Sequence, residues 1–175
     1  MENKTNDSIE KYYPSSIANF FLYQSFDENI PLTPMKLIKL VYIAYGWHLA
    51  IYDKKLFDEK IQAWNYGPVI PSIYHEFKRF GKDQINDYSR SLNEKTGELS
   101  LVKVVKDRTE VSKTLKIVWE IYKNHSAEQL SELTHETGSP WDKAINNNGL
   151  FSEINDEDIK EISKFAIYKK LINNN

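Results

Sequence analysis

Residues Leu32–Phe77 read LTPMKLIKLVYIAYGWHLAIYDKKLFDEKIQAWNYGPVIPSIYHEF, and this stretch decides the fold. Thr33 suits the N-cap of a helix, and Pro34 suits its first turn because no backbone hydrogen-bond donor is needed there. The segment Leu40–Ile51 contains no charged residue, and apolar side chains would cover two faces of a helix. The pattern therefore predicts a central buried helix at about 33–52, packed by neighbours on several sides.

Three residues in the middle of this helix carry further information. Gly46 costs about 1 kcal/mol relative to alanine in a helix, so we expect it to mark close packing against another helix. Trp47 and His48 follow it in apolar surroundings. We interpret His48 as a core histidine that hydrogen-bonds a neighbouring element, in preference to a catalytic group.

The second half of the opening stretch contains a turn with two aromatics and two prolines, Trp64-Asn-Tyr-Gly-Pro-Val-Ile-Pro71. One interpretation is a turn that plugs the core with its aromatic side chains. The other is a rigid aromatic ridge for a protein partner, since tryptophan and tyrosine dominate binding hot spots. The two interpretations are compatible, and the candidate partner-binding residues are Trp64, Tyr66, Pro68, Pro71 and Tyr74.

The rest of the chain is predicted to be mainly helical. Helical periodicity and capping residues indicate further helices at about 14–26, 71–81, 107–123, 126–133, 139–149 and 155–170. Residues 82–106 are the least decided, with a turn at 93–97 and a strand-like alternation at 99–105 that allow a small β-hairpin or irregular extended segments. We therefore predict a flexible N-terminus at 1–12 and a single compact helical domain at 13–175.

Composition excludes several classes of protein. The 175 residues include no cysteine, which excludes disulfides and thiolate chemistry, and the formal net charge of −2 gives no general attraction to nucleic acid or anionic membrane. The polar N-terminus lacks the apolar core of a signal peptide, and Leu40–Ile51 is too short to span a bilayer. We expect a cytoplasmic protein without a membrane partner.

Motifs for catalysis or metal binding are missing from the sequence. The four histidines, at 48, 75, 125 and 135, form no HExxH pair, and neither a P-loop nor a Gly-x-Ser-x-Gly elbow occurs. We therefore expect no catalytic, metal-binding or cofactor-binding residues, and no enzyme. A basic cluster at Lys78, Arg79 and Lys82 is interleaved with acidic residues, so a solvated helix face is favoured over nucleic-acid binding.

Three blocks of this sequence, taken together, resemble the Panacea domain, the SocA-like antitoxin or phage-associated protein family. The first block is Met35–Ala50, the second contains Leu56-Phe-Asp and Ala63–Pro71, and the third contains Leu130–His135 and Ser139–Ala144. They lie in the family's order, and the resemblance extends over roughly residues 14–170. Seven residues belong to these motifs and are interpreted as structural: Gly46, Trp47, His48, Gly67, His135, Pro140 and Trp141.

The resemblance implies a small helical antitoxin of a toxin–antitoxin system, with a cognate toxin encoded by an adjacent gene as its partner. Direct neutralisation by binding is the expected mode, and delivery of the toxin to a ClpXP-type protease is the alternative. An enzyme with a site around His48 and His135 is the least favoured alternative. Residues 82–106 depart from the family pattern, so partner choice could reside there or at the polar termini.

Overall fold

The structure is a computed structural model that describes residues 12–92, 95–102, 105 and 108–173. In this part of the chain the fold is mainly α, as predicted, with two small antiparallel hairpins. The predicted flexible N-terminus lies outside the described residues, apart from Tyr12. The elements in chain order are α1 (Pro14–Glu28), α2 (Pro34–Tyr52), β1 (Gln62–Trp64), β2 (Gly67–Val69), α3 (Pro71–Phe77), the 3-10 helix η1 (Lys78–Phe80), β3 (Arg90–Leu92), β4 (Leu99–Leu101), α4 (Glu110–Tyr122), α5 (Ala127–His135), α6 (Pro140–Asn148) and α7 (Asp156–Asn173).

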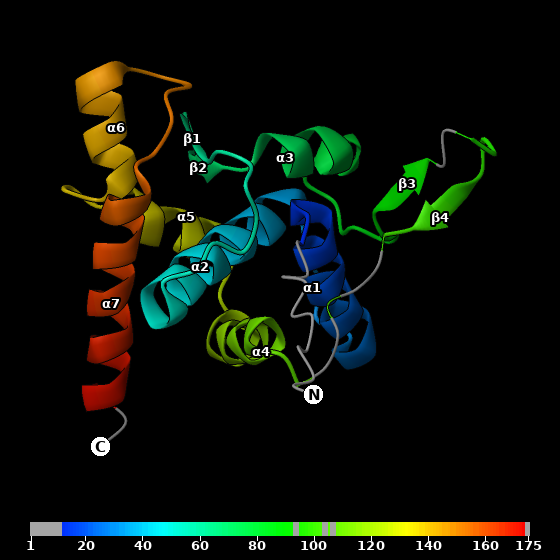
Figure 1. Ribbon diagram of the computed structural model, residues 1–175, viewed down its shortest axis with the longest axis horizontal. Helices are drawn as coiled ribbons and strands as arrows, with labels where there is room; N and C mark the ends of the chain where they lie inside the picture. Colours follow the sequence, from blue (N-terminus) through cyan, green and yellow to red (C-terminus); the bar gives the residue numbers. More distant parts are fainter. Residues whose placement is uncertain (1–11, 93–94, 103–104, 106–107, 174–175) are drawn as a thin grey trace, which may run out of the picture.

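Helix α2 lies at the centre of the molecule, and the predicted central buried helix is confirmed (Figure 1). It packs against α1, α4, α5 and α7, which lie on different sides of it. Thr33 caps its N-terminus, with the side-chain oxygen accepting a hydrogen bond from the Lys36 amide at 3.4 Å. All but one of its residues from Pro34 to Leu49 are buried, which leaves its polar side chains to find partners inside the protein.

The contact between α2 and α7 depends on Gly46. A Cβ atom at this position would lie 3.0 Å from the Ile159 Cγ2 atom and closer still to the Ser163 hydroxyl. Only a hydrogen on this Cα therefore lets the two helices approach to their observed separation. The close packing expected of Gly46 is confirmed, and the cost of a glycine within a helix is offset by the contact between helices.

The β1–β2 hairpin pairs Gln62 with Val69 and Trp64 with Gly67. One edge of β1 pairs with β2. The other edge pairs with the connection between α6 and α7. The Ala63 amide donates to the Ser152 carbonyl at 2.9 Å, and the Phe151 amide donates to the Ala63 carbonyl at 2.8 Å. These bonds bring Phe151, remote in sequence, beside the hairpin.

The β3–β4 hairpin projects from the helices at the right of the view in Figure 1, on the side away from α6 and α7. Its base is attached to α1 by the buried side chain of Asn19. The Nδ2 atom of Asn19 donates to the carbonyls of Ser89 and Val102, at 3.1 and 2.9 Å, and its Oδ1 atom accepts from the Ser89 amide at 2.7 Å. The predicted small hairpin is confirmed, although β4 (Leu99–Leu101) ends earlier than the alternation at 99–105 indicates.

Among the described residues, no helix combines the length and the apolar character that crossing a membrane requires.

Candidate partner-binding groove

The segment Trp64–Pro71 has both buried and exposed residues. Tyr66, at the turn of the β1–β2 hairpin, is 72% exposed, whereas Pro68 is buried. Trp64 is half-buried, and Pro71 is half-buried in the first turn of α3. Tyr74, one turn later, is 36% exposed. The backbone and Pro68 therefore belong to the frame of the protein, while the aromatic side chains reach its surface.

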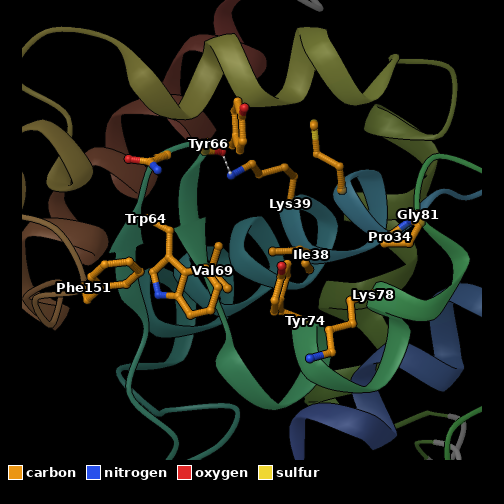
Figure 2. A pocket seen from close by; sticks show the side chains of 12 residues that line it. Pro34, Ile38, Lys39, Trp64, Tyr66, Val69, Tyr74, Lys78, Gly81 and Phe151 are labelled. Carbon is orange, nitrogen blue, oxygen red and sulfur yellow. Dashed lines mark hydrogen bonds between the residues drawn. The ribbon is translucent and has the colours of Figure 1, made fainter.

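Lys39 of α2 fixes the hairpin turn from below. Its Nζ atom donates hydrogen bonds to the carbonyls of Tyr66 and Pro68, at 2.5 and 3.1 Å, while the residue is only 1% exposed (Figure 2). Burial disfavours the charged ammonium and lowers the pKa of Lys39 to about 7. Sequence reasoning missed this role, although a lysine on the buried face of a strongly apolar helix was a usable signal.

Gly67 allows the hairpin turn to approach both Lys39 and α5. Its φ is +97°, a value that favours glycine, and a Cβ atom there would lie 2.8 Å from the His135 Cε1 atom and 3.1 Å from the Thr134 Oγ1 atom. The same Cβ would collide with the Lys39 ammonium group. Gly67 therefore has a structural role in this fold.

His135 and Trp141 also contact the hairpin. The Nδ1 atom of His135 lies 2.6 Å from the Ser131 carbonyl, so this histidine bonds its local backbone. Its ring centroid is 4.3 Å from that of Trp141, whose Nε1 atom donates to the Trp64 carbonyl at 2.7 Å. Pro140 is buried in the first turn of α6, where it starts the helix that carries Trp141.

A groove opens between α2, the β1–β2 hairpin, α3 and the Phe151 loop (Figure 2). The Trp64 ring centroid is 4.8 Å from that of Tyr74 and 5.5 Å from that of Phe151, so three aromatic rings form one wall. The groove encloses about 480 Å³, which lies within the range of ligand pockets. We call it the aromatic groove, and its lining residues are Pro34, Met35, Ile38, Lys39, Trp64, Asn65, Tyr66, Val69, Tyr74, Lys78, Gly81 and Phe151.

His48 lies in a different environment, inside the contact between α2 and α4. Its Nδ1 atom is 3.2 Å from the Thr114 hydroxyl, and its ring centroid is 4.8 Å from that of Tyr52. Burial lowers the pKa of His48 to about 4, so the imidazole is neutral at physiological pH. The neighbouring Trp47 is buried, with its ring centroid 6.0 Å from that of Tyr122.

The two histidines of the alternative enzyme site therefore have separate partners. His48 bonds Thr114 of α4, whereas His135 contacts Ser131 and Trp141. Over the ranges that the structure describes, no cluster of three or more histidine, aspartate or glutamate side chains is arranged to hold a metal ion. In the described part of the chain, the two histidines share no hydrogen-bond or ring partner.

Comparison with known proteins identifies the family of this chain. The family model described as "Antitoxin SocA-like, Panacea domain" matches residues 37–142, which is more than half of the chain. The chain belongs to this family. The Panacea match extends from α2 into α6, so it contains all seven motif residues and the whole β1–β2 hairpin.

A curated relative of this Panacea protein is antitoxin SocA from Caulobacter vibrioides (strain NA1000 / CB15N). The two sequences are 29% identical over 154 residues, which cover 86% of this chain and 81% of the relative. No solved structure matches. The aromatic groove lies within the Panacea match except for Pro34, Met35 and Phe151.

Proposed function

We propose that this Panacea protein is a cytoplasmic antitoxin that neutralises a toxin by binding it directly through the aromatic groove. Membership of the SocA-like family and the antitoxin name of its curated relative support the antitoxin role. The observation that carries the choice of surface is the exposure of Tyr66 and Phe151, at 72% and 59%, beside the Trp64 and Tyr74 rings. We propose a toxin encoded by an adjacent gene as the partner.

The groove is suited to binding because its frame is already ordered. Trp64 is held by its own Nε1 hydrogen bond to the Gln62 Oε1 atom at 2.9 Å and by the Trp141 bond to its carbonyl. Lys39 fixes the backbone on either side of Gly67. A partner that docks here therefore meets a backbone that is already ordered, which lowers the part of the entropic cost of association that comes from ordering the turn.

The decisive experiment is co-expression of the toxin from the adjacent gene with antitoxin variants. Wild-type protein should restore growth and form a complex that elutes together on gel filtration. Tyr66→Ala should weaken the complex by about tenfold or more, the loss expected of a hot-spot aromatic, without lowering the unfolding midpoint. Tyr23→Ala is the matched control, because Tyr23 is 51% exposed on α1 and does not line the groove.

The same co-expression assay, repeated in a second host, distinguishes direct blocking of the toxin from its delivery to a protease. In a host without the ClpXP protease, direct blocking predicts that wild-type protein still restores growth. Loss of rescue in that host would favour the adaptor mode. Failure of wild-type protein both to restore growth and to form a complex would contradict the antitoxin role with this partner.

A further inference from the structure

The charge of the aromatic groove has one sign. Its lining includes two lysines, Lys39 and Lys78, and no aspartate or glutamate among the residues that the structure describes. Lys39 is bonded to two backbone carbonyls and has no carboxylate among its hydrogen-bond partners. Lys78 is exposed on η1 and lies beside Tyr74 (Figure 2). The exposed Lys78 therefore places a positive charge next to an apolar surface, while Lys39 is buried in the wall of the groove.

The three residues of the basic cluster, Lys78, Arg79 and Lys82, do not all face the groove. Arg79 lies over the Phe80 ring, 4.9 Å from its centroid, and its Nη2 atom is 3.8 Å from the Asp87 carboxylate. Lys82 is exposed and does not line the groove. Only Lys78 of the three faces the aromatic groove, so its charge is available to a ligand there.

Most of the remaining lining of the groove is apolar. Ile38, Val69 and Pro34 contribute aliphatic surface to the lining of the groove. A ligand that gains from both features must carry an apolar side chain for this surface and an anionic group within reach of Lys78. Desolvation next to the aromatic wall strengthens the attraction between a lysine and a carboxylate relative to the same pair in open water.

We propose that the aromatic groove binds an extended segment of the toxin in which a carboxylate, from aspartate or glutamate, is adjacent to a large apolar side chain. The carboxylate pairs with Lys78, and the apolar side chain packs against Trp64 and Tyr74. This inference rests on the proposed function, because it specifies the chemistry of the partner at the same groove.

A peptide segment fits the charge of the groove better than a nucleic acid does. Single-stranded nucleic acid binds through a track of several basic residues that contact successive phosphates. This groove offers one exposed lysine, and the whole chain carries a formal net charge of −2. A single carboxylate matches that supply of charge.

Selection from a phage-displayed library of random linear peptides tests the proposal without knowledge of the toxin. Peptides enriched on wild-type protein should contain aspartate or glutamate next to leucine, phenylalanine or tryptophan. Lys78→Glu should weaken these peptides by about tenfold or more, as measured by fluorescence anisotropy. Lys82→Glu is the matched control and should bind them like wild type, because it makes the same charge change outside the groove.

Three results of the peptide experiments would overturn the inference. These are enriched peptides without an acidic residue, peptide binding that Lys78→Glu leaves unchanged, and a selection that yields no peptide. Lys78-dependent binding of single-stranded oligothymidylate in place of peptides would also overturn it. The toxin assay separates this inference from the proposed function. Growth rescue and complex formation that are unaffected by Lys78→Glu would reject the acidic segment and retain the antitoxin role, whereas failure of wild-type rescue would reject that role.

Discussion

The buried Lys39 should make the stability of this protein depend on pH in the alkaline range. Its pKa is lowered from 10.5 to about 7 by burial, so between these values the unfolded chain holds a proton that the folded protein has released. Because the unfolded state binds more protons there, the free energy of unfolding rises with pH. Integrated from pH 7 to pH 10, the two pKa values give a gain of about 3–4 kcal/mol from this residue.

Urea unfolding of wild type and Lys39→Met at pH 7 and pH 10 isolates this contribution. The variant lacks the titrating group, so its free energy of unfolding should rise by about 3–4 kcal/mol less than that of wild type. At pH 10 the variant should also be less stable outright, because the carbonyls of Tyr66 and Pro68 lose their donor at about 1 kcal/mol or more each. Lys82→Met, an exposed lysine, should follow wild type at both values.

The unfolding experiment stops at pH 10 because tyrosine titration also changes the stability above that pH. Burial raises the pKa of Tyr42 and Tyr45, so above pH 10 the unfolded chain loses tyrosine protons that the folded protein keeps, and stability falls again. If Lys39→Met does not fold, Lys39→Gln retains a donor for the turn and removes the same titration. Equal pH dependence in wild type and both variants would refute the argument, because it would mean that Lys39 keeps an ordinary pKa in the folded protein.

Three further predictions concern the frame of the molecule. Gly46→Ala should lower the free energy of unfolding by about 1–3 kcal/mol through overpacking, and Ser163→Ala in the same chain should recover part of the loss; additive effects would argue against a direct clash. Between pH 7 and pH 4, wild type should lose about 3 kcal/mol more than His48→Gln in urea unfolding, because the unfolded histidine takes up a proton that the buried one, with a pKa of about 4, resists; parallel losses would exclude this. Trp141→Phe should cost about 1 kcal/mol in the same assay, since the Trp64 carbonyl loses its donor, and an unchanged midpoint would show that water replaces the bond.

The local elements could be predicted because their signals are local. The Thr33 cap and Pro34 fix the start of α2, and the apolar run that follows needs no knowledge of its neighbours to be assigned as buried. Gly46 also indicated close packing against another helix, although the sequence did not identify α7 as that helix. His48 lies 3.2 Å from the Thr114 hydroxyl, a contact with a neighbouring helix of the kind that its apolar surroundings indicated.

The groove could be predicted only in part, because its walls come from distant parts of the chain. Trp64, Tyr66 and Tyr74 stood out as a local cluster of aromatics. Phe151 joins them through backbone pairing with Ala63, and no periodicity or turn signal links residues so far apart. Lys39 was visible only as a charge near an apolar run, since its role depends on carbonyls that the fold brings to it.

The arrangement around Gly67 explains how one segment can belong to both the core and the proposed binding surface. The backbone carbonyls of Trp64, Tyr66 and Pro68 face inward and accept from Trp141 and Lys39, which leaves the aromatic side chains directed to the groove. Substitutions of the inward partners should therefore weaken a toxin complex only to the extent that they destabilise the fold. Substitutions of the outward side chains should weaken the complex while the unfolding midpoint stays unchanged. Measuring both quantities on Lys39→Met and Tyr66→Ala tests this division, and a loss of stability in Tyr66→Ala equal to its loss of binding would contradict it.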